Sequence, residues 1–252
     1  IPLSMKGSVY STVLGRLAAC PGEIYPLHVG DTYLEPATLC RMEDLAVAEH
    51  PGMHRYAPPQ GLPLLVDAVV ERLRAKTGGP LDRENVFVSG GATSGLACVV
   101  GSIVAPGDEV AILAPHWPLI EGHVRMAGGV PLDVPFFGVV DSRESAIAAV
   151  EAARTPRTVA LYVNTPSNPT GHVVPRGWLE GLVDVARRHD LWLLFDEVYE
   201  DYVYEGEHVP GLSLAPERSF AVHSCSKAYG MAGNRVGWVA GPAAPLAEAL
   251  KL

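Results

Sequence analysis

Short runs of apolar residues recur along the chain from residue 86 onward. A run that is apolar throughout, such as Leu191–Phe195, is typical of a strand covered on both faces. Segments of helical character lie before and between the runs, with amphipathic spacing clearest over Leu62–Lys76. The runs predict strands at residues 86–89, 110–114, 130–134, 159–163, 191–195, 220–223 and 236–240. Helices are predicted at residues 36–50, 62–76, 96–104, 142–153, 178–190 and from 245 onward.

Alternating strands and helices predict an α/β fold with a mostly parallel, seven-stranded sheet covered by helices. The last strand follows its predecessor too closely for a parallel crossover of about a dozen residues, so we expect it to be antiparallel. Residues 1–33 are rich in Gly, Pro and Tyr and show little periodicity, which predicts an extended N-terminal arm. Residues 34–252 are expected to form one large domain.

Composition and charge matter here mainly for what they exclude. The chain has 252 residues, a formal net charge of −9 and a sequence pI near 5.4, which argues against nucleic acid as its main partner. The cysteines form no CxxC pair and no zinc spacing, so we predict no metal site and expect reduced thiols in the cytoplasm. The start lacks a signal-peptide pattern, and the longest apolar stretch, residues 96–105, is too short to span a membrane.

A lysine among small residues follows the predicted strand at 220–223. Its segment reads Ser-Cys-Ser-Lys-Ala-Tyr-Gly-Met-Ala-Gly-Asn-Arg, from Ser224 through Lys227 to Arg235. A buried or cation-crowded lysine loses its proton more easily and can form an imine with an aldehyde. Arg235 is a fixed cation suited to phosphate. The segment therefore indicates a reactive lysine with a phosphate-binding arginine eight residues further along the chain.

Three other polar segments also follow predicted strands. The glycine-rich turn Gly90–Gly95 opens a helix and points free N–H groups at one spot, which suits a phosphate. In Asn164–Gly171, two X-Pro bonds fix a loop and aim the side chain of Asn168. Asp196 leaves a fully apolar strand, and a carboxylate there is costly to bury unless it meets a cation. Since open α/β sheets bind ligands beyond strand carboxyl ends, these segments predict one site.

The motifs SNPTG, DEVY and SxSKxxGxxGxR resemble those of the aminotransferase class I/II family, the fold-type I pyridoxal 5′-phosphate (PLP) enzymes related to aspartate aminotransferase. The resemblance implies PLP as cofactor, with Lys227 forming its Schiff base and removing the substrate Cα proton. Asp196 would hold the pyridine nitrogen, while Asn168 and Tyr199 would bind the phenolate oxygen. The other implied cofactor contacts are Gly91, Ala92, Thr93, Ser224 and Arg235 at the phosphate and Trp117 stacked on the ring.

The same resemblance implies a homodimer with shared active sites, because the family counterpart of Tyr56 reaches the phosphate of the neighbouring subunit. Gly30 and Asn168 are implied to contact the substrate. The family's smaller C-terminal domain, which supplies an arginine for the substrate carboxylate, is expected to be missing, so no such arginine is named.

The implied reaction is transfer of an amino group between an L-amino acid and a 2-oxo acid. Two alternatives remain open on the motifs: a PLP-dependent lyase, cyclase or other side-chain reaction, and a non-catalytic PLP-binding sensor. The identity of the amino acid is open as well, because it depends on side chains at the mouth of the site.

Overall fold

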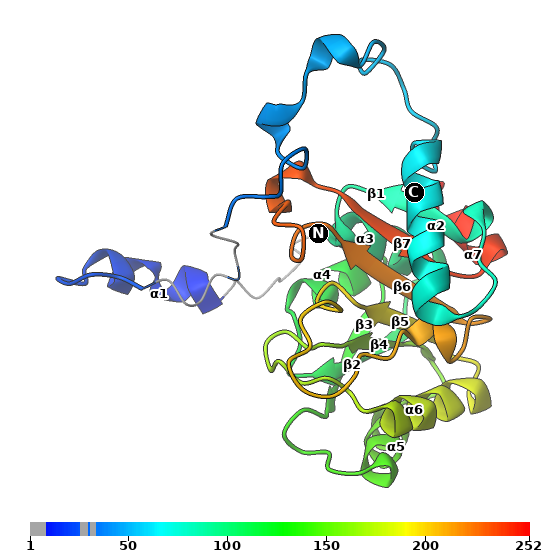
Figure 1. Ribbon diagram of the computed structural model, residues 1–252. Helices are drawn as coiled ribbons and strands as arrows, with labels where there is room; N and C mark the ends of the chain where they lie inside the picture. Colours follow the sequence, from blue (N-terminus) through cyan, green and yellow to red (C-terminus); the bar gives the residue numbers. More distant parts are fainter. Residues whose placement is uncertain (1–8, 26–29, 31–33) are drawn as a thin grey trace.

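The computed structural model describes residues 9–25, 30 and 34–252, and its centre is one seven-stranded sheet (Figure 1). The strand order is β1-β7-β6-β5-β4-β2-β3. The strands are β1 Val86–Ser89, β2 Glu109–Ala114, β3 Val130–Pro135, β4 Thr158–Asn164, β5 Trp192–Asp196, β6 Ser219–Ser224 and β7 Gly237–Ala240. The helices are α1 Val9–Ala18, α2 Pro63–Thr77, α3 Ala92–Ile103, α4 Leu119–Met126, α5 Arg143–Ala153, α6 Arg176–Arg188 and α7 Ala243–Ala249. Short 3₁₀ helices are η1 Met42–Asp44, η2 Val47–Glu49, η3 Arg83–Asn85, η4 Gly211–Ser213 and η5 Ala232–Asn234.

All seven predicted strands are present, with ends that differ by one residue at most. β2 pairs in parallel with β3 and β4, and the parallel ladder continues through β5 to β6. β7 is antiparallel to both of its neighbours, β6 and β1, as its short connection from β6 predicts. The mostly parallel sheet is therefore confirmed, together with its single reversed strand.

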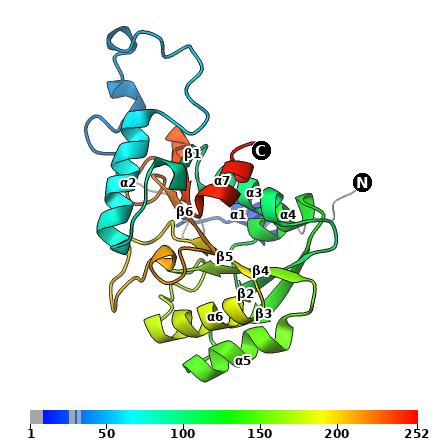
Figure 2. The ribbon, with the colours of Figure 1, turned by 90° about the vertical axis from the view of Figure 1, so that its right-hand side faces the viewer.

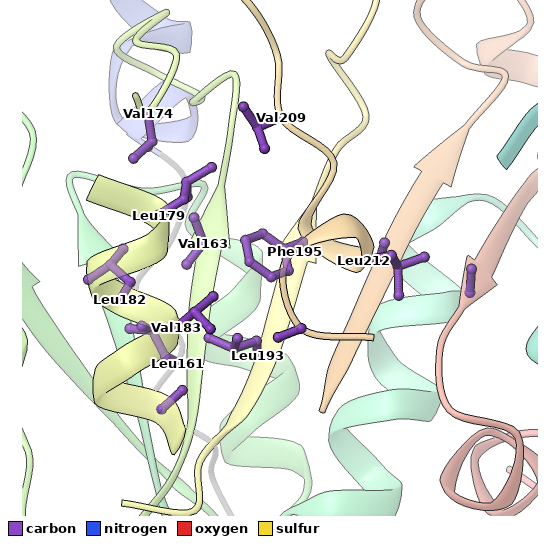
Figure 3. Close-up of a cluster of buried hydrophobic side chains, with 14 of the residues drawn as sticks. Leu161, Val163, Val174, Leu179, Leu182, Val183, Leu193, Phe195, Val209 and Leu212 are labelled. Atoms are coloured by element: carbon purple, nitrogen blue, oxygen red, sulfur yellow. The ribbon is translucent and has the colours of Figure 1, made fainter. Parts of the chain in front are cut away.

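Alternation along each strand divides the core into two layers. In β4, Leu161 and Val163 face α2, α5 and α6, whereas Ala160 and Tyr162 face α3, α4 and α7. Figure 2 shows α5 and α6 packed side by side beneath the sheet. Figure 3 shows apolar side chains of β4 and β5 meeting those of α6, with Phe195 at the centre. Because both faces of the sheet centre are covered, the middle positions of β4 and β5 are apolar throughout.

Local sequence signals explain several helix ends. α2 begins with Pro63, whose fixed φ suits the first helical position, and ends at Gly78 with a left-handed φ of 68°. The side chain of Ser142 accepts from the N–H of Ser145 and caps α5. α3 begins at Ala92, four residues before the predicted start at Leu96, so the glycine-rich turn already contains its first turn.

The predicted helix over residues 36–50 is wrong. Residues 36–50 do not form one helix but only η1 and η2, because their large apolar side chains find no packing surface among the residues that the structure describes. Leu39 and Met42, for example, are 86% and 65% exposed. The predicted extended arm contains α1, which lies apart from the sheet (Figure 1). Of the described residues, no helix is long and apolar enough to cross a membrane.

Candidate active site

A cavity of about 480 Å³ opens where the carboxyl ends of β4, β5 and β6 meet the start of α3. It is lined by every predicted site residue except Gly91 and Tyr56. The predicted residues in its wall are Gly30, Ala92, Thr93, Trp117, Asn168, Asp196, Tyr199, Ser224, Lys227 and Arg235. Residues from segments about 200 positions apart thus converge on one space at the edge where open α/β sheets bind ligands.

One end of the cavity carries positive charge and free donors. α3 starts after Gly91, which has no side chain to cap it, so no side chain of the described residues accepts from the N–H groups of its first turn. The guanidinium of Arg235 lies beside this turn, where it donates to the carbonyl oxygens of Ala232 at 2.8 Å and Gly90 at 3.4 Å. The Ser224 hydroxyl also lines the cavity. This end suits a dianionic group such as a phosphate.

Two glycines allow the close approach of these elements. A Cβ atom on Gly91, whose φ is +83°, would lie 2.5 Å from the Arg235 Nη2 atom. A Cβ atom on Gly237 would lie 2.7 Å from the backbone N of Ala92, the backbone C of Gly91 and the carbonyl O of His223. The start of α3 therefore rests directly on β7, and Arg235 reaches it only because position 91 is a glycine. Gly91 shapes the phosphate end from behind the cavity wall.

Asp196, the last residue of β5, also lines the cavity and is almost fully buried. Its Oδ2 atom accepts a hydrogen bond from the hydroxyl of Tyr162 at 2.6 Å, and Oδ1 accepts a long one from Val198 N–H at 3.4 Å. Burial raises the pKa of Asp196, and the hydrogen bond from Tyr162 opposes this rise. A buried carboxylate of this kind is stabilised by a cation that enters the cavity.

A pair of amide and phenol groups lies beside Asp196. The Asn168 Nδ2 atom donates to the hydroxyl oxygen of Tyr199 at 3.4 Å. Asn164 fixes the loop from below: its Oδ1 accepts from Asn168 N–H at 2.6 Å, and its Nδ2 donates to the Asp196 carbonyl at 2.9 Å. Burial raises the pKa of Tyr199, so its hydroxyl keeps its proton. The two side chains offer donors to one anionic oxygen.

Lys227 lines the same cavity. Its Nζ atom donates to the Gly30 carbonyl oxygen at 2.6 Å and lies 5.7 Å from the centre of the Tyr199 ring. The Lys227 carbonyl accepts a hydrogen bond from the Tyr202 hydroxyl at 3.0 Å, which ties the lysine loop to the segment after β5. The amine is half-buried in the cavity, where a ligand aldehyde can reach it.

Trp117 lines the cavity beside Leu96, at the end of β2. The His116 ring makes two hydrogen bonds, between Nδ1 and the Trp117 carbonyl oxygen at 3.1 Å and between Nε2 and the Asp133 Oδ1 atom at 2.9 Å. These bonds hold the turn that follows β2. Tyr56, in contrast, is fully exposed and lies outside the cavity. Its segment belongs to the loop that arches away from the sheet before α2 (Figure 1).

Sequence reasoning missed the role of Tyr162 as the hydrogen-bond partner of Asp196. Tyr162 is one of several apolar or aromatic residues within β4, and nothing local marks it. The alternation within β4 and β5 places both side chains on the same face, but only the register, with Tyr162 opposite Leu194, brings the hydroxyl to the carboxylate. The cavity also includes Leu96, Asn164, Val198, Ser226 and Ala232, which were not among the predicted site residues.

Fold and cavity together define an α/β protein with a cavity at the carboxyl edge of its sheet, lined by a lysine, a buried carboxylate and the uncapped start of a helix. The family model for aminotransferase class I and II matches residues 25–252, and the chain belongs to this family. Enzymes of the family depend on PLP.

Among its relatives, a probable aspartate/prephenate aminotransferase of Thermus aquaticus is 43% identical over 196 residues, which are 77% of this chain and 50% of that protein. The arginine–pyruvate transaminase of Pseudomonas aeruginosa is 38% identical over 226 residues, covering 88% and 56% of the two chains. The solved aspartate aminotransferase from Thermus thermophilus with maleate has a TM-score of 0.83 at 33% identity, covering 98% of this chain and 65% of that one. The chain thus spans about half the length of the curated relatives it matches.

The residues present fit PLP. The uncapped start of α3 with Arg235 matches its phosphate, and the buried carboxylate of Asp196 matches a protonated ring nitrogen. Asn168 and Tyr199 match the ring oxygen, and the Lys227 amine matches the aldehyde. These contacts remain predictions for this chain, since each is inferred from the shape and chemistry of the cavity.

Proposed function

We propose that this chain is the cofactor-binding part of a PLP-dependent aminotransferase, which moves an amino group between an L-amino acid and a 2-oxo acid. The observation that carries the proposal is the convergence of Lys227, Asp196 and the start of α3 on one cavity. These groups are complementary to the aldehyde, the ring nitrogen and the phosphate of one cofactor.

Each residue has a defined task in this proposal. Bound PLP supplies an aldehyde for the amino group and a ring that draws electrons away from the substrate Cα atom. The α3 N–H groups and Arg235 anchor the phosphate. The Asp196 carboxylate holds a proton at the ring nitrogen. The Lys227 Nζ atom, once free and uncharged, takes the proton from the substrate Cα.

Asn168 and Tyr199 complete the arrangement by orienting the ring. Their donors bind the ring oxygen, so the ring is held at three separate points: phosphate, nitrogen and oxygen. A ring fixed in this way aims the bond to be broken at Lys227, and orientation of this kind contributes several kcal/mol to catalysis, on the order of 7 to 11 in favourable cases. Gly30, whose carbonyl holds the lysine amine, lies where the substrate would enter.

The names of the relatives favour transamination over elimination, cyclisation or sensing. The printed names differ in their amino donors, aspartate/prephenate in one relative and arginine–pyruvate in another. We therefore assign the substrate class, an L-amino acid with a 2-oxo acid, and no individual substrate. The cysteines at positions 20, 40, 98 and 225 are all unpaired, which supports a reducing compartment, and we place the protein in the cytoplasm.

The proposal includes a homodimer with shared active sites. The loop before α2 exposes several large apolar side chains, among them Leu39, Met42, Val47 and Met53, and it ends near the fully exposed Tyr56. A second copy of the chain would cover this surface. Tyr56 could then donate its hydroxyl hydrogen bond to the phosphate bound by the neighbouring chain.

A panel of amino donors tests the proposal. The purified protein is loaded with PLP and incubated with single L-amino acids and 2-oxoglutarate or pyruvate, and products are identified by mass spectrometry. We expect the 2-oxo acid of at least one donor to form with the protein and not with a Lys227→Ala variant. Lys251→Ala, which removes an exposed lysine outside the cavity, serves as the matched control and should retain activity. Release of ammonia together with a 2-oxo acid, without amination of the acceptor, would contradict transamination.

A further inference from the structure

A cluster of buried charged side chains lies on the opposite face of the sheet from the cavity. Asp196 and Glu197 are consecutive, so Asp196 faces Tyr162 on the cavity side while Glu197 faces the layer of α2 and α6. His223 of β6 and Glu200 lie on the same side as Glu197. The side chains of Glu197, Glu200 and His223 are only 1%, 6% and 2% exposed. Charged groups are this deeply buried only when they compensate one another.

The His223 ring lies between the two carboxylates. Its Nε2 atom is 3.6 Å from the Glu197 Oε2 atom, and its Nδ1 atom is 3.4 Å from the Glu200 Oε1 atom. These are ion-pair distances, and neither ring nitrogen makes a hydrogen bond with any residue that the structure describes. The ring stacks on Trp238 of β7, with centres 5.4 Å apart and planes 17° from parallel. Stacking fixes the ring so that one nitrogen faces each carboxylate.

The charges around the ring favour its protonated form. Glu200 also pairs with Arg72 at 3.1 Å and Lys76 at 3.0 Å, and both cations contact Asp201. The three carboxylates are therefore those of Glu197, Glu200 and Asp201, and they face two basic side chains, Arg72 and Lys76, together with the imidazole. Burial alone would lower the pKa of His223, but Glu200 and then Glu197 raise it above its usual value.

The two carboxylates mark the ends of a tight turn. Glu197 accepts a hydrogen bond from Gly211 N–H at 2.7 Å, and its carbonyl accepts from Glu200 N–H at 3.0 Å, which closes the turn. Asp196 directly precedes this turn and Tyr199 lies within it. A group that pairs with both Glu197 and Glu200 therefore fixes the turn between them. In doing so it also fixes the side chains of Asp196 and Tyr199, which line the cavity on the other face of the sheet.

We propose that His223, as an imidazolium held between Glu197 and Glu200, is a positioning residue for the Asp196–Glu200 segment. It keeps the turn in one shape, and its positive charge favours the ionised carboxylate of Asp196 across the sheet. This inference rests on the proposed function, because the ionised Asp196 matters through the proton it holds at the ring nitrogen of PLP. His223 itself touches neither cofactor nor substrate.

A bound metal ion is the rival explanation for this cluster. Ligand atoms of Glu197, Glu200 and His223 lie within 4.8 Å of one another, and a cavity of about 440 Å³ on this side reaches Glu200 and His208. His208 faces Glu197 as well, at 3.7 Å. Two basic side chains already pair with Glu200, however, and a divalent cation would have to displace or repel them. The charge balance favours the imidazolium.

The first test reads the charge of His223 in cofactor-free protein. With ¹³C,¹⁵N-labelled histidine, the ring resonances of His223 are assigned by their loss in a His223→Gln variant. We expect the ring to titrate with a midpoint above the usual histidine pKa of 6.5. A midpoint at or below 6.5 overturns the proposal, as does one tightly bound divalent ion per chain found by elemental analysis and lost in His223→Gln.

Two variants keep this test decisive. Glu200→Gln removes one of the facing carboxylates, so the titration midpoint of His223 should fall below that of the native protein. If circular dichroism shows that His223→Gln does not fold, the ring resonances of His223 are assigned instead by their shift in Glu200→Gln. His189→Gln is the matched control: this histidine pairs with Glu151 at the end of α6, and its loss should leave the His223 resonance unchanged.

The second test measures the protonation of the ring nitrogen of bound PLP. With PLP labelled by ¹⁵N in the ring, we expect a protonated ring nitrogen in the native protein at pH 8. In His223→Gln the nitrogen should lose its proton at a pH lower by at least one unit, and kcat should fall about tenfold while KM changes less than twofold. Native protein that does not bind PLP contradicts the proposed function. If the native protein binds PLP and His223→Gln has the same ¹⁵N shift and kcat as the native protein, only the role of His223 is contradicted and the proposed function stands.

Discussion

Gly237→Ala is a minimal change at the point where β7 supports the phosphate end of the cavity. The added Cβ atom would meet three backbone atoms at 2.7 Å, from Ala92, Gly91 and His223. That is about 0.7 Å short of the 3.4 Å at which ordinary contact begins. Backbone atoms cannot rotate away as a flexible side chain can, so the start of α3 must move away from β7.

The size of the effect follows from two costs. Overpacking of a close contact typically costs about 1–3 kcal/mol of stability. For a domain of this size that corresponds to a fall in Tm of about 2–12 °C. Misplacing one charge-assisted hydrogen bond to the phosphate costs about 1.5–3 kcal/mol in binding. The Kd for PLP should therefore rise about tenfold to a hundredfold.

The assay compares PLP with pyridoxal, which has the same ring and aldehyde but no phosphate. Binding is titrated by absorbance for native protein, Gly237→Ala and the control Gly233→Ala, whose Cβ atom would meet nothing within 4 Å. Only Gly237→Ala should weaken PLP, and it should weaken pyridoxal much less. A Kd for PLP within about twofold of native, or an equal loss for both ligands, would refute the assignment of the phosphate to the start of α3.

Three further outcomes are expected. Asp196→Asn should stay folded but lose about 100-fold or more in kcat, because a neutral amide holds the ring proton poorly; near-native turnover in steady-state kinetics would count against this role. A Tyr56→Asp subunit, which sets a negative charge against the phosphate, and a Lys227→Ala subunit should each be inactive alone. Mixed at equal amounts they should recover about a quarter of native activity if dimers share sites, and confirmed subunit exchange without recovery would place Tyr56 at a site of its own chain. Burial alone would raise the pKa of Glu200, but pairing with His223 and its other partners lowers it below the usual 4.5, so this carboxylate stabilises the fold above that pH and ceases to do so as the pH falls. Urea unfolding at pH 7 and pH 4 should therefore show a smaller acid loss for Glu200→Gln than for native protein.

The strands and most of the cavity could be predicted from the sequence because their signals are local. A strand that is covered on both faces must be apolar along its whole length, so the strand containing Phe195 is recognisable without a structure. The polar segments after such strands must converge because the carboxyl ends of parallel strands share one edge. The prediction that Asp196 and Lys227 lie near each other needed no further information than this.

What could not be predicted depends on contacts with distant residues. Residues 36–50 have helical spacing, but a short helix needs a surface to pack on, and within the described part of the chain Leu39 is 86% exposed. The partnership of Tyr162 with Asp196 depends on strand register, which no single segment specifies. His223 looked like one member of an apolar run, and only the pairing of β6 with β7 and the turn after β5 reveals its charged surroundings.

Reductive trapping tests the central claim most directly. The purified protein is incubated with PLP, reduced with sodium borohydride, digested and mapped by mass spectrometry, with Lys227→Ala treated in parallel. The account predicts that the mass of the reduced cofactor is found on the peptide that contains Lys227 and is absent from the variant. Cofactor mass on another lysine of the native protein, or none on Lys227 after PLP has bound, would contradict the account.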